Sequence, residues 1–136
     1  MAKKSKTVWT WAQSNDPAKP TEPEKNRITT LFATFVQALN ASLPALAEPQ
    51  EFNQVVKIES KWRGSYFYLM SHYKSAPRPN NIKDGFEMGI ARLTAKGGNK
   101  YDLAYFRHTG KWFTLLVDLS AEECLEYIKT QPIFTV

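Results

Sequence analysis

Apolar side chains recur every three or four positions over residues 26–43, which is the spacing that places them along one side of an α-helix. Thr21 and Glu24, just before this stretch, have the spacing of a capping box, in which each side chain satisfies a backbone N–H of the first turn. Pro44 pushes the residue before it out of the helical conformation. The pattern therefore predicts a helix over residues 26–43.

After a proline-containing loop the apolar period changes to two, which is typical of β-strands. Phe52, Gln54, Val56 and Ile58 share one side of the first such stretch, and we expect that side to be buried. Arg63-Gly64 then provides a tight turn, so the first two strands are expected to form an antiparallel hairpin. The strands that follow the first are expected at residues 65–73, 87–95, 101–107 and 111–117.

Ser120 and Glu123 again have capping-box spacing, and they predict a short helix that runs to about Lys129 and ends before Pro132. The order of elements is therefore helix, five strands, helix. It indicates an α+β fold, an antiparallel sheet of about five strands with the N-terminal helix and the short C-terminal helix on one face. A chain of 136 residues has room for one core, which we assign to a single domain over residues 24–136.

Residues 1–23 carry lysines and prolines but few large apolar side chains, so they are interpreted as a flexible basic arm. Trp9 and Trp11 leave two alternatives open. They either pack back onto the domain as a docked strand or serve as an aromatic anchor for a partner. Residues 74–85 form a long loop between two strands, and loops of this length are often functional.

The sequence offers little for catalysis. His72, His108 and Cys124 are the only histidines and cysteine, and their spacing matches no metal site, so we expect no metal, no cofactor and no Cys–His nucleophile. Glu59 and Lys61 have the Glu-x-Lys spacing of a metal-dependent nuclease, but the partner acid on a preceding strand is missing. We therefore expect that the protein is not an enzyme, with a nuclease as a remote alternative.

The single cysteine excludes an intramolecular disulfide and fits a reducing compartment. The longest apolar run, Tyr66–Met70, is far shorter than the roughly 20 residues of a membrane span. The lysines at the start of the chain are not followed by the apolar stretch of a signal peptide. A cytoplasmic location without membrane attachment is the expectation.

The charge distribution points to a binding partner. The chain has 18 basic and 13 acidic side chains, and residues 52–113 alone hold eleven basic against four acidic ones. Aromatic residues, which make up 13% of the chain, are interleaved with these cations, and this mixture suits stacked bases and phosphates. Aromatic residues are also common in any strand, and lysines in any exposed face, so the pattern equally fits a soluble sheet.

Several motifs resemble a small family of uncharacterised bacterial proteins, for which no activity is assigned. The resemblance extends from end to end and includes the lysine-rich start. It implies one bacterial cytoplasmic domain and supplies no catalytic residue. Its most specific motifs are Arg107-His-Thr-Gly-Lys-Trp112, Asp118-Leu-Ser120, Glu123-Cys-Leu-Glu126 and Pro132-Ile-Phe134.

We predict a non-catalytic binding domain for RNA or single-stranded DNA rather than for duplexes, because Arg27 is the only basic residue in the predicted helix 26–43. The alternative is a protein–protein interaction module that uses the same aromatic surface, since aromatic residues and arginine are also the usual interface anchors. The oligomeric state is left open. The candidate nucleic-acid contacts are Lys3, Lys4, Lys6, Lys57, Trp62, Arg63, Arg78, Arg92, Tyr105, Arg107 and Lys111.

Overall fold

A computed structural model describes residues 17–79 and 84–135 of the chain. A long helix, α2 (Glu22–Ser42), comes before the sheet, and a short helix, α3 (Ala121–Thr130), and a 3-10 turn, η2 (Pro132–Phe134), follow it. Neighbouring strands are all antiparallel, in the order β1-β2-β3-β4-β5, so the predicted α+β fold is confirmed. The strands are β1 (Gln54–Arg63), β2 (Tyr66–Lys74), β3 (Gly85–Gly97), β4 (Lys100–Phe106) and β5 (Trp112–Leu119).

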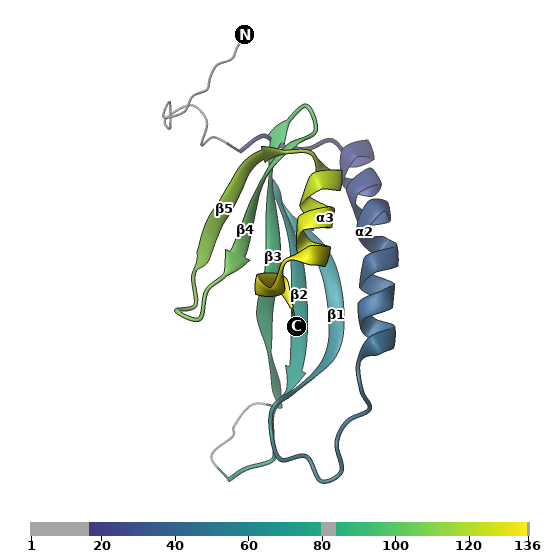
Figure 1. Cartoon of the computed structure of the whole chain (residues 1–136), viewed down its shortest axis with the longest axis vertical. Coiled ribbons are helices and arrows are strands. Elements are labelled where there is room, and N and C mark those ends of the chain that lie inside the picture. Colours follow the sequence, from purple (N-terminus) through teal and green to yellow (C-terminus); the bar gives the residue numbers. More distant parts are fainter. Residues whose placement is uncertain (1–16, 80–83, 136) are drawn as a thin grey trace.

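The helices cover one face of a twisted sheet, with α2 beside β1 and α3 in front of the central strands (Figure 1). The core lies between these two layers. Phe32 of α2 packs against Phe67 of β2 with ring centroids 5.1 Å apart, and Cys124 of α3 is fully buried in the same cluster. The expected position of both helices on a single face is thus confirmed.

Both helix starts follow from capping. α2 begins at Glu22, four residues before the predicted start, and Thr21 Oγ1 accepts a hydrogen bond from the Glu24 N–H at 3.3 Å. The Glu24 carboxylate accepts a hydrogen bond from the Tyr101 hydroxyl of β4 and so ties this first turn to the sheet. At α3 the capping box of Ser120 and Glu123 is complete, with hydrogen bonds of 2.8 and 3.1 Å.

Within residues 17–79 and 84–135, neither α2 nor α3 has the length and apolar character of a membrane-spanning helix.

The predicted buried side of the first strand is wrong at two positions. Phe52 precedes β1 and is 73% exposed. Between Val55 and Lys57 the pairing with β2 shifts by one residue, which leaves Val56 without a partner and 46% exposed, while Val55 packs against the core. A β-bulge of this kind reverses the alternation of side chains, and the sequence period alone does not reveal it.

The free edge of β1 is covered by a side chain of α2. Asn40 Nδ2 donates to the Ile58 carbonyl at 2.8 Å, and the Ile58 N–H donates to Asn40 Oδ1 at 2.8 Å. The amide of Asn40 therefore makes the two hydrogen bonds that a residue of a neighbouring strand would make. Trp62 Nε1 donates to the Lys25 carbonyl at 3.2 Å and adds a second link between helix and strand.

Part of the predicted arm lies against the domain. The Ala18 N–H donates to the Ala95 carbonyl at the end of β3 at 2.8 Å, and Pro20 is buried. Trp9 and Trp11, with the two alternatives left open for them, lie outside the described residues.

Candidate functional site

The face of the sheet opposite the helices carries an aromatic and basic surface. Phe67 and Leu69 of β2 are fully buried beneath the helices, so the alternation of the strand turns Tyr66, Tyr68 and Met70 to the other side. Pairing with the neighbouring strands extends this side across the sheet. We call it the outer face, and its side chains include Lys57, Glu59, Lys61, Arg63, Tyr66, Tyr68, Met70, His72, Glu87, Arg92, Phe106 and Trp112.

Arg92 of β3 lies at the centre of the outer face, between two aromatic rings. Its guanidinium carbon is 4.9 Å from the ring centroid of Tyr66 and 5.4 Å from that of Trp112. Tyr68 completes the group, with its ring centroid 5.7 Å from that of Trp112 and 6.2 Å from that of Tyr66. Three strands thus bring together a cation and three rings that are far apart in the sequence.

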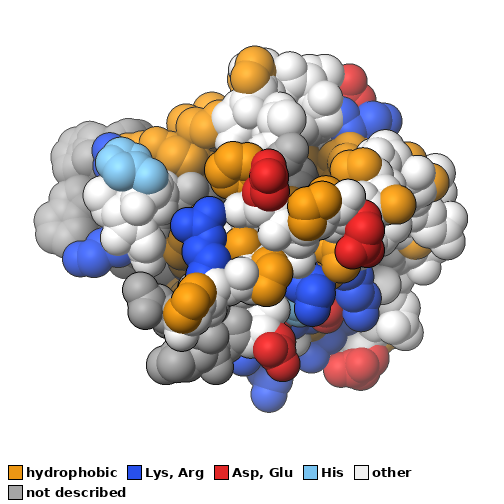
Figure 2. Space-filling model, turned by 90° about the horizontal axis from the view of Figure 1, so that it is seen from below, with side chains coloured by type: hydrophobic (Ala, Val, Ile, Leu, Met, Phe, Trp, Pro, Cys, Tyr) orange, Lys and Arg blue, Asp and Glu red, His pale blue; other side chains and the backbone are white. Residues whose placement is uncertain are grey.

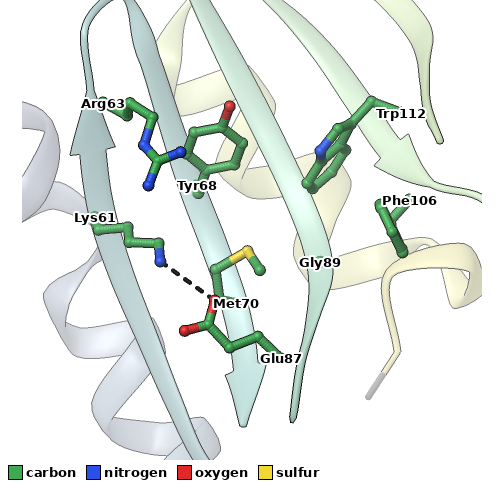
Figure 3. Close-up of a pocket in the computed structure, with 8 residues that line it drawn as sticks. All are labelled: Lys61, Arg63, Tyr68, Met70, Glu87, Gly89, Phe106 and Trp112. Carbon is green, nitrogen blue, oxygen red and sulfur yellow. Dashed lines mark hydrogen bonds and ion pairs between the residues drawn. The ribbon is translucent and has the colours of Figure 1, made fainter. Parts of the chain in front are cut away.

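A pocket of about 260 Å³ opens beside this group. Figure 3 shows Lys61 and Arg63 on one side of it and Trp112 and Phe106 on the other, facing one another across β2 and β3. Gly89 forms part of the floor, where a Cβ atom would lie only 2.5 Å from the Trp112 indole. The pocket depends on this glycine, since a side chain there would occupy the space of the indole.

The acidic groups of the outer face lie beside basic side chains, and Lys57 Nζ is 3.8 Å from Glu59 Oε1. Lys61 Nζ is 3.3 Å from Glu87 Oε1, and His72 lies between Glu59 and Glu87, at 2.5 Å and 3.7 Å. Arg63 and Arg92, in contrast, pair with no carboxylate of the described chain, and Arg92 Nε is buried without a hydrogen-bond partner there. The outer face therefore presents two guanidinium groups whose charge is not neutralised by a neighbouring acid.

Two of the predicted aromatic contacts lie on the helix-covered face. Trp62 is partly buried, its ring centroid is 5.1 Å from that of Phe67, and its Nε1 is hydrogen-bonded to α2. Tyr105 is also partly buried against the core and packs edge-on against Phe113. Stacking on a base requires an exposed ring face. Because both rings pack on the helix-covered side, we leave them out of the candidate site.

The remaining predicted cations are scattered. Arg78 donates to the Glu51 carbonyl at 2.9 Å, in the loop after β2. Arg107 lies over the Phe113 ring at 5.0 Å, on the helix-covered side, and Lys111 is exposed in the β4–β5 turn. The end of the molecule with this loop and turn mixes basic, acidic and hydrophobic side chains (Figure 2). Lys3, Lys4 and Lys6 lie outside the described residues. Of the predicted set, the outer face brings together Lys57, Arg63 and Arg92.

Several residues of the site were absent from the predicted set. Tyr66 and Tyr68 alternate with the apolar Phe67 and Leu69, and this alternation is the signal that could have placed them opposite the core. The contributions of Glu87 and Trp112 depend on pairing between strands, which the period of one strand does not give. Also absent were Lys61, Met70, Gly89 and Phe106.

The described residues provide little for metal or nucleophilic chemistry. No three His, Cys, Asp or Glu side chains in residues 17–79 and 84–135 are grouped so that they could hold a metal ion. The Cys124 thiol is fully buried, and this burial raises its pKa to about 12, so the thiol is protonated and weakly nucleophilic at neutral pH. What the outer face offers a ligand is aromatic surface and unneutralised positive charge.

Comparison with known proteins places the chain in a family. No curated protein and no solved structure matches it. A family match extends over residues 20–135 and so includes both helices and all five strands. The chain belongs to the family described as Domain of unknown function (DUF3024).

Proposed function

We propose that this domain binds single-stranded nucleic acid, RNA or DNA, on the outer face of its sheet. The observation that supports the proposal most is Arg92, whose guanidinium lies between Tyr66 and Trp112 and has no acidic partner among the described residues. Open sheet faces bind single strands by stacking bases on aromatic rings, while arginines contact phosphates. A group of this kind, with Arg63 nearby, supplies both types of contact.

Single strands are favoured over duplexes because neither α2 nor α3, the two α-helices of the described residues, presents a cluster of basic side chains. In α2, Lys25 pairs with Glu22 at 3.4 Å. Arg27 pairs with Glu122 at 3.1 Å and donates to Asn99 at 2.6 Å. A helix that reads a DNA groove needs cations that are free to contact phosphates and bases. In this domain two arginines without an acidic partner among the described residues, Arg63 and Arg92, lie instead on the sheet.

Titration of labelled ten-residue oligo(U) and oligo(dT) at several salt concentrations tests the proposal. If about six phosphates are contacted, the slope of log affinity against log salt is expected to be about −4 for a single strand. Charge reversal at Arg92 should weaken binding strongly. Binding no tighter than that of an unrelated protein of net charge +5, or unaffected by Arg92→Glu in a folded variant, would contradict the proposal.

A protein–protein interaction module is the second candidate, and one observation favours it. Phe113, Leu115 and Val117 are exposed apolar side chains on β5, which is the last strand of the sheet. An edge strand with apolar side chains is suited to pairing with an extended segment of another protein. Pull-down with and without nuclease treatment separates the two candidates, because partners that survive digestion favour the protein module.

A further inference from the structure

The pocket on the outer face contains one acidic side chain among basic and aromatic ones. Glu87 of β3 lines it together with Lys61, Arg63 and three aromatic residues. A carboxylate repels phosphates, so its presence on a surface that binds a nucleic-acid backbone is unfavourable unless it contacts another part of the ligand. The groups on a nucleotide that donate hydrogen bonds to a carboxylate are the ribose hydroxyls and the N–H groups of the base, and only the N–H groups differ from one base to another.

The Glu87 carboxylate is held in place from two sides. Lys61 Nζ is 3.3 Å from Oε1, and His72 Nδ1 is 3.7 Å from Oε2 (Figure 3 shows the contact with Lys61). The side chain is still 44% exposed, so its oxygens can accept further hydrogen bonds. Glu87 therefore has a defined position and free acceptor capacity at one end of the pocket.

The size and walls of the pocket suit a single base. Its volume of about 260 Å³ is just below the ~300–1,000 Å³ range typical of pockets for drug-sized ligands. Tyr68, Phe106 and Trp112 provide flat apolar walls, and the Trp112 indole can lie over Gly89 because that residue has no side chain. A base that leaves the stack of a flexible single strand can enter such a site edge first.

The chemistry of the four bases then distinguishes them. Guanine carries two adjacent donors on its Watson–Crick edge, the N1–H and the N2 amino group, and they match the two oxygens of a carboxylate. Adenine and cytosine place a ring nitrogen acceptor next to their amino group, and uracil flanks its N3–H with two carbonyls. Each of these three presents an acceptor to the carboxylate, which repels it.

We infer that this pocket takes one guanine base of the bound strand and that Glu87 is the residue that selects it. The inference rests on the proposed function, because it assigns the specificity of the same surface. Arg63, which lines the pocket, and Arg92, which lies over the Trp112 ring beside it, contact phosphates and so bind any sequence equally. Affinity and selectivity are therefore carried by different side chains.

The test compares three labelled RNAs of nine residues: oligo(U), the same strand with one central guanosine, and the same strand with one central adenosine. One guanosine per strand avoids guanine quadruplexes. The wild-type protein should bind the guanosine strand about tenfold more tightly or better, as expected for a two-donor contact. A strand with a central adenosine should bind like oligo(U).

Glu87→Gln should lower the affinity for the guanosine strand to that for oligo(U), so that the preference is lost. Glu59→Gln is the matched control, because Glu59 is also an outer-face carboxylate bound to His72 but does not line the pocket. This variant should keep the preference. Circular dichroism of both variants confirms that they are folded before binding is compared.

The outcomes separate the two proposals. Equal binding of all three RNAs by the wild-type protein would overturn the guanine pocket and leave the proposed function standing. A preference that survives Glu87→Gln would overturn the role of Glu87. Failure of the wild-type protein to bind any of the strands would overturn the proposed function itself, and the guanine pocket with it.

Discussion

The six-membered ring of the Trp112 indole lies over the Cα of Gly89, in the space that a side chain at position 89 would occupy. Trp112 belongs to β5 and Gly89 to β3, so the indole reaches across β4 to make this contact. It continues to Tyr68 of β2, at a centroid distance of 5.7 Å. One aromatic residue at the edge of the sheet thus depends on the absence of a side chain two strands away.

Gly89→Ala is expected to displace the indole. The added methyl would lie 2.5 Å from two atoms of Trp112 and 3.1 Å from Phe106 Cβ, so the ring has to move. Overpacking of this kind costs about 1–3 kcal/mol, and we expect the lower end because Trp112 is only partly buried and its ring can shift. Urea denaturation measures the decrease in stability, and tryptophan fluorescence reports the changed surroundings of the ring.

A double-mutant cycle with Trp112→Leu isolates this contact. If the clash with the indole is the cause, Gly89→Ala should cost much less in the Trp112→Leu background than in the wild-type protein. Equal costs in both backgrounds would mean that Gly89 is needed for the backbone of β3 and not for the indole.

Arg63→Glu and Arg107→Glu are expected to affect oligonucleotide binding differently. Both arginines are exposed and near strand ends, but Arg63 borders the pocket while Arg107 lies over Phe113 on the helix-covered side. The two substitutions change the net charge equally, so a general effect of charge is the same in both. Arg63→Glu should weaken binding and lower the size of the salt slope by about 0.7 for each phosphate that is no longer neutralised. Equal effects of the two variants in fluorescence titrations would argue against an interface on the outer face.

Tyr101→Phe is expected to destabilise the domain. Tyr101 is fully buried, and burial together with the hydrogen bond to Glu24 raises the pKa of its hydroxyl well above the ordinary value. Removing the hydroxyl leaves the partly buried Glu24 carboxylate without this donor, which costs about 1–3 kcal/mol. Tyr127→Phe, on the exposed side of α3, is the control and should stay within about 0.5 kcal/mol of the wild type in urea denaturation.

The stability of the domain should decrease above about pH 9, in part because of Cys124. Burial, reinforced by nearby carboxylates, raises the pKa of this thiol from 9.0 to about 12. Above pH 9 the unfolded chain therefore releases the thiol proton while the folded protein retains it. The free energy of unfolding then falls by about 1.4 kcal/mol per pH unit from this group.

Urea denaturation between pH 8 and 10 of the wild type and of Cys124→Ala checks this dependence. The variant is less stable at pH 8, because a buried side chain is shortened, but its stability should fall less steeply with pH. Parallel pH profiles for the two proteins would contradict a strongly raised thiol pKa.

The order of elements could be predicted from the sequence because each element carries its own period. The helix with Ile28 and Phe32 follows a three-to-four residue spacing, and the strands follow a spacing of two. The face of the sheet on which a side chain lies was harder to predict than the helix or strand to which the residue belongs. The bulge beside Val56 changes which side chains are buried, and another shift, between Leu69 and Met70, lets Ile90 of β3 point into the core next to Ala91. Such shifts depend on pairing between strands and have no local signature.

For the candidate site, the sequence indicated which residue types are abundant but not which residues lie together. The abundance of arginine and aromatic residues in the sheet was visible, and Arg92 was among the expected contacts. Its neighbours Tyr66 and Trp112 come from two other strands, and register alone brings them together. Trp62 and Tyr105 were expected among the contacts because they are aromatic. Side chains alternate along a strand, and the direct neighbours Arg63 and Phe106 point to the outer face, so Trp62 and Tyr105 point to the helix-covered face.

The hydrogen bonds between Asn40 and Ile58 have a consequence for self-association. A sheet that is open at both edges can add copies at each end and so grow into a fibre. Here α2 runs along β1 and its Asn40 amide already makes the hydrogen bonds that an incoming strand would need at Ile58, whereas β5 is the last strand of the described sheet. Addition through β5 of one copy to β5 of another uses the edge that the described residues leave open on each copy. Within the described residues, strand pairing between copies can therefore continue at β5 but not at Ile58 of β1, so pairing of this kind would join two copies and not a growing row of them.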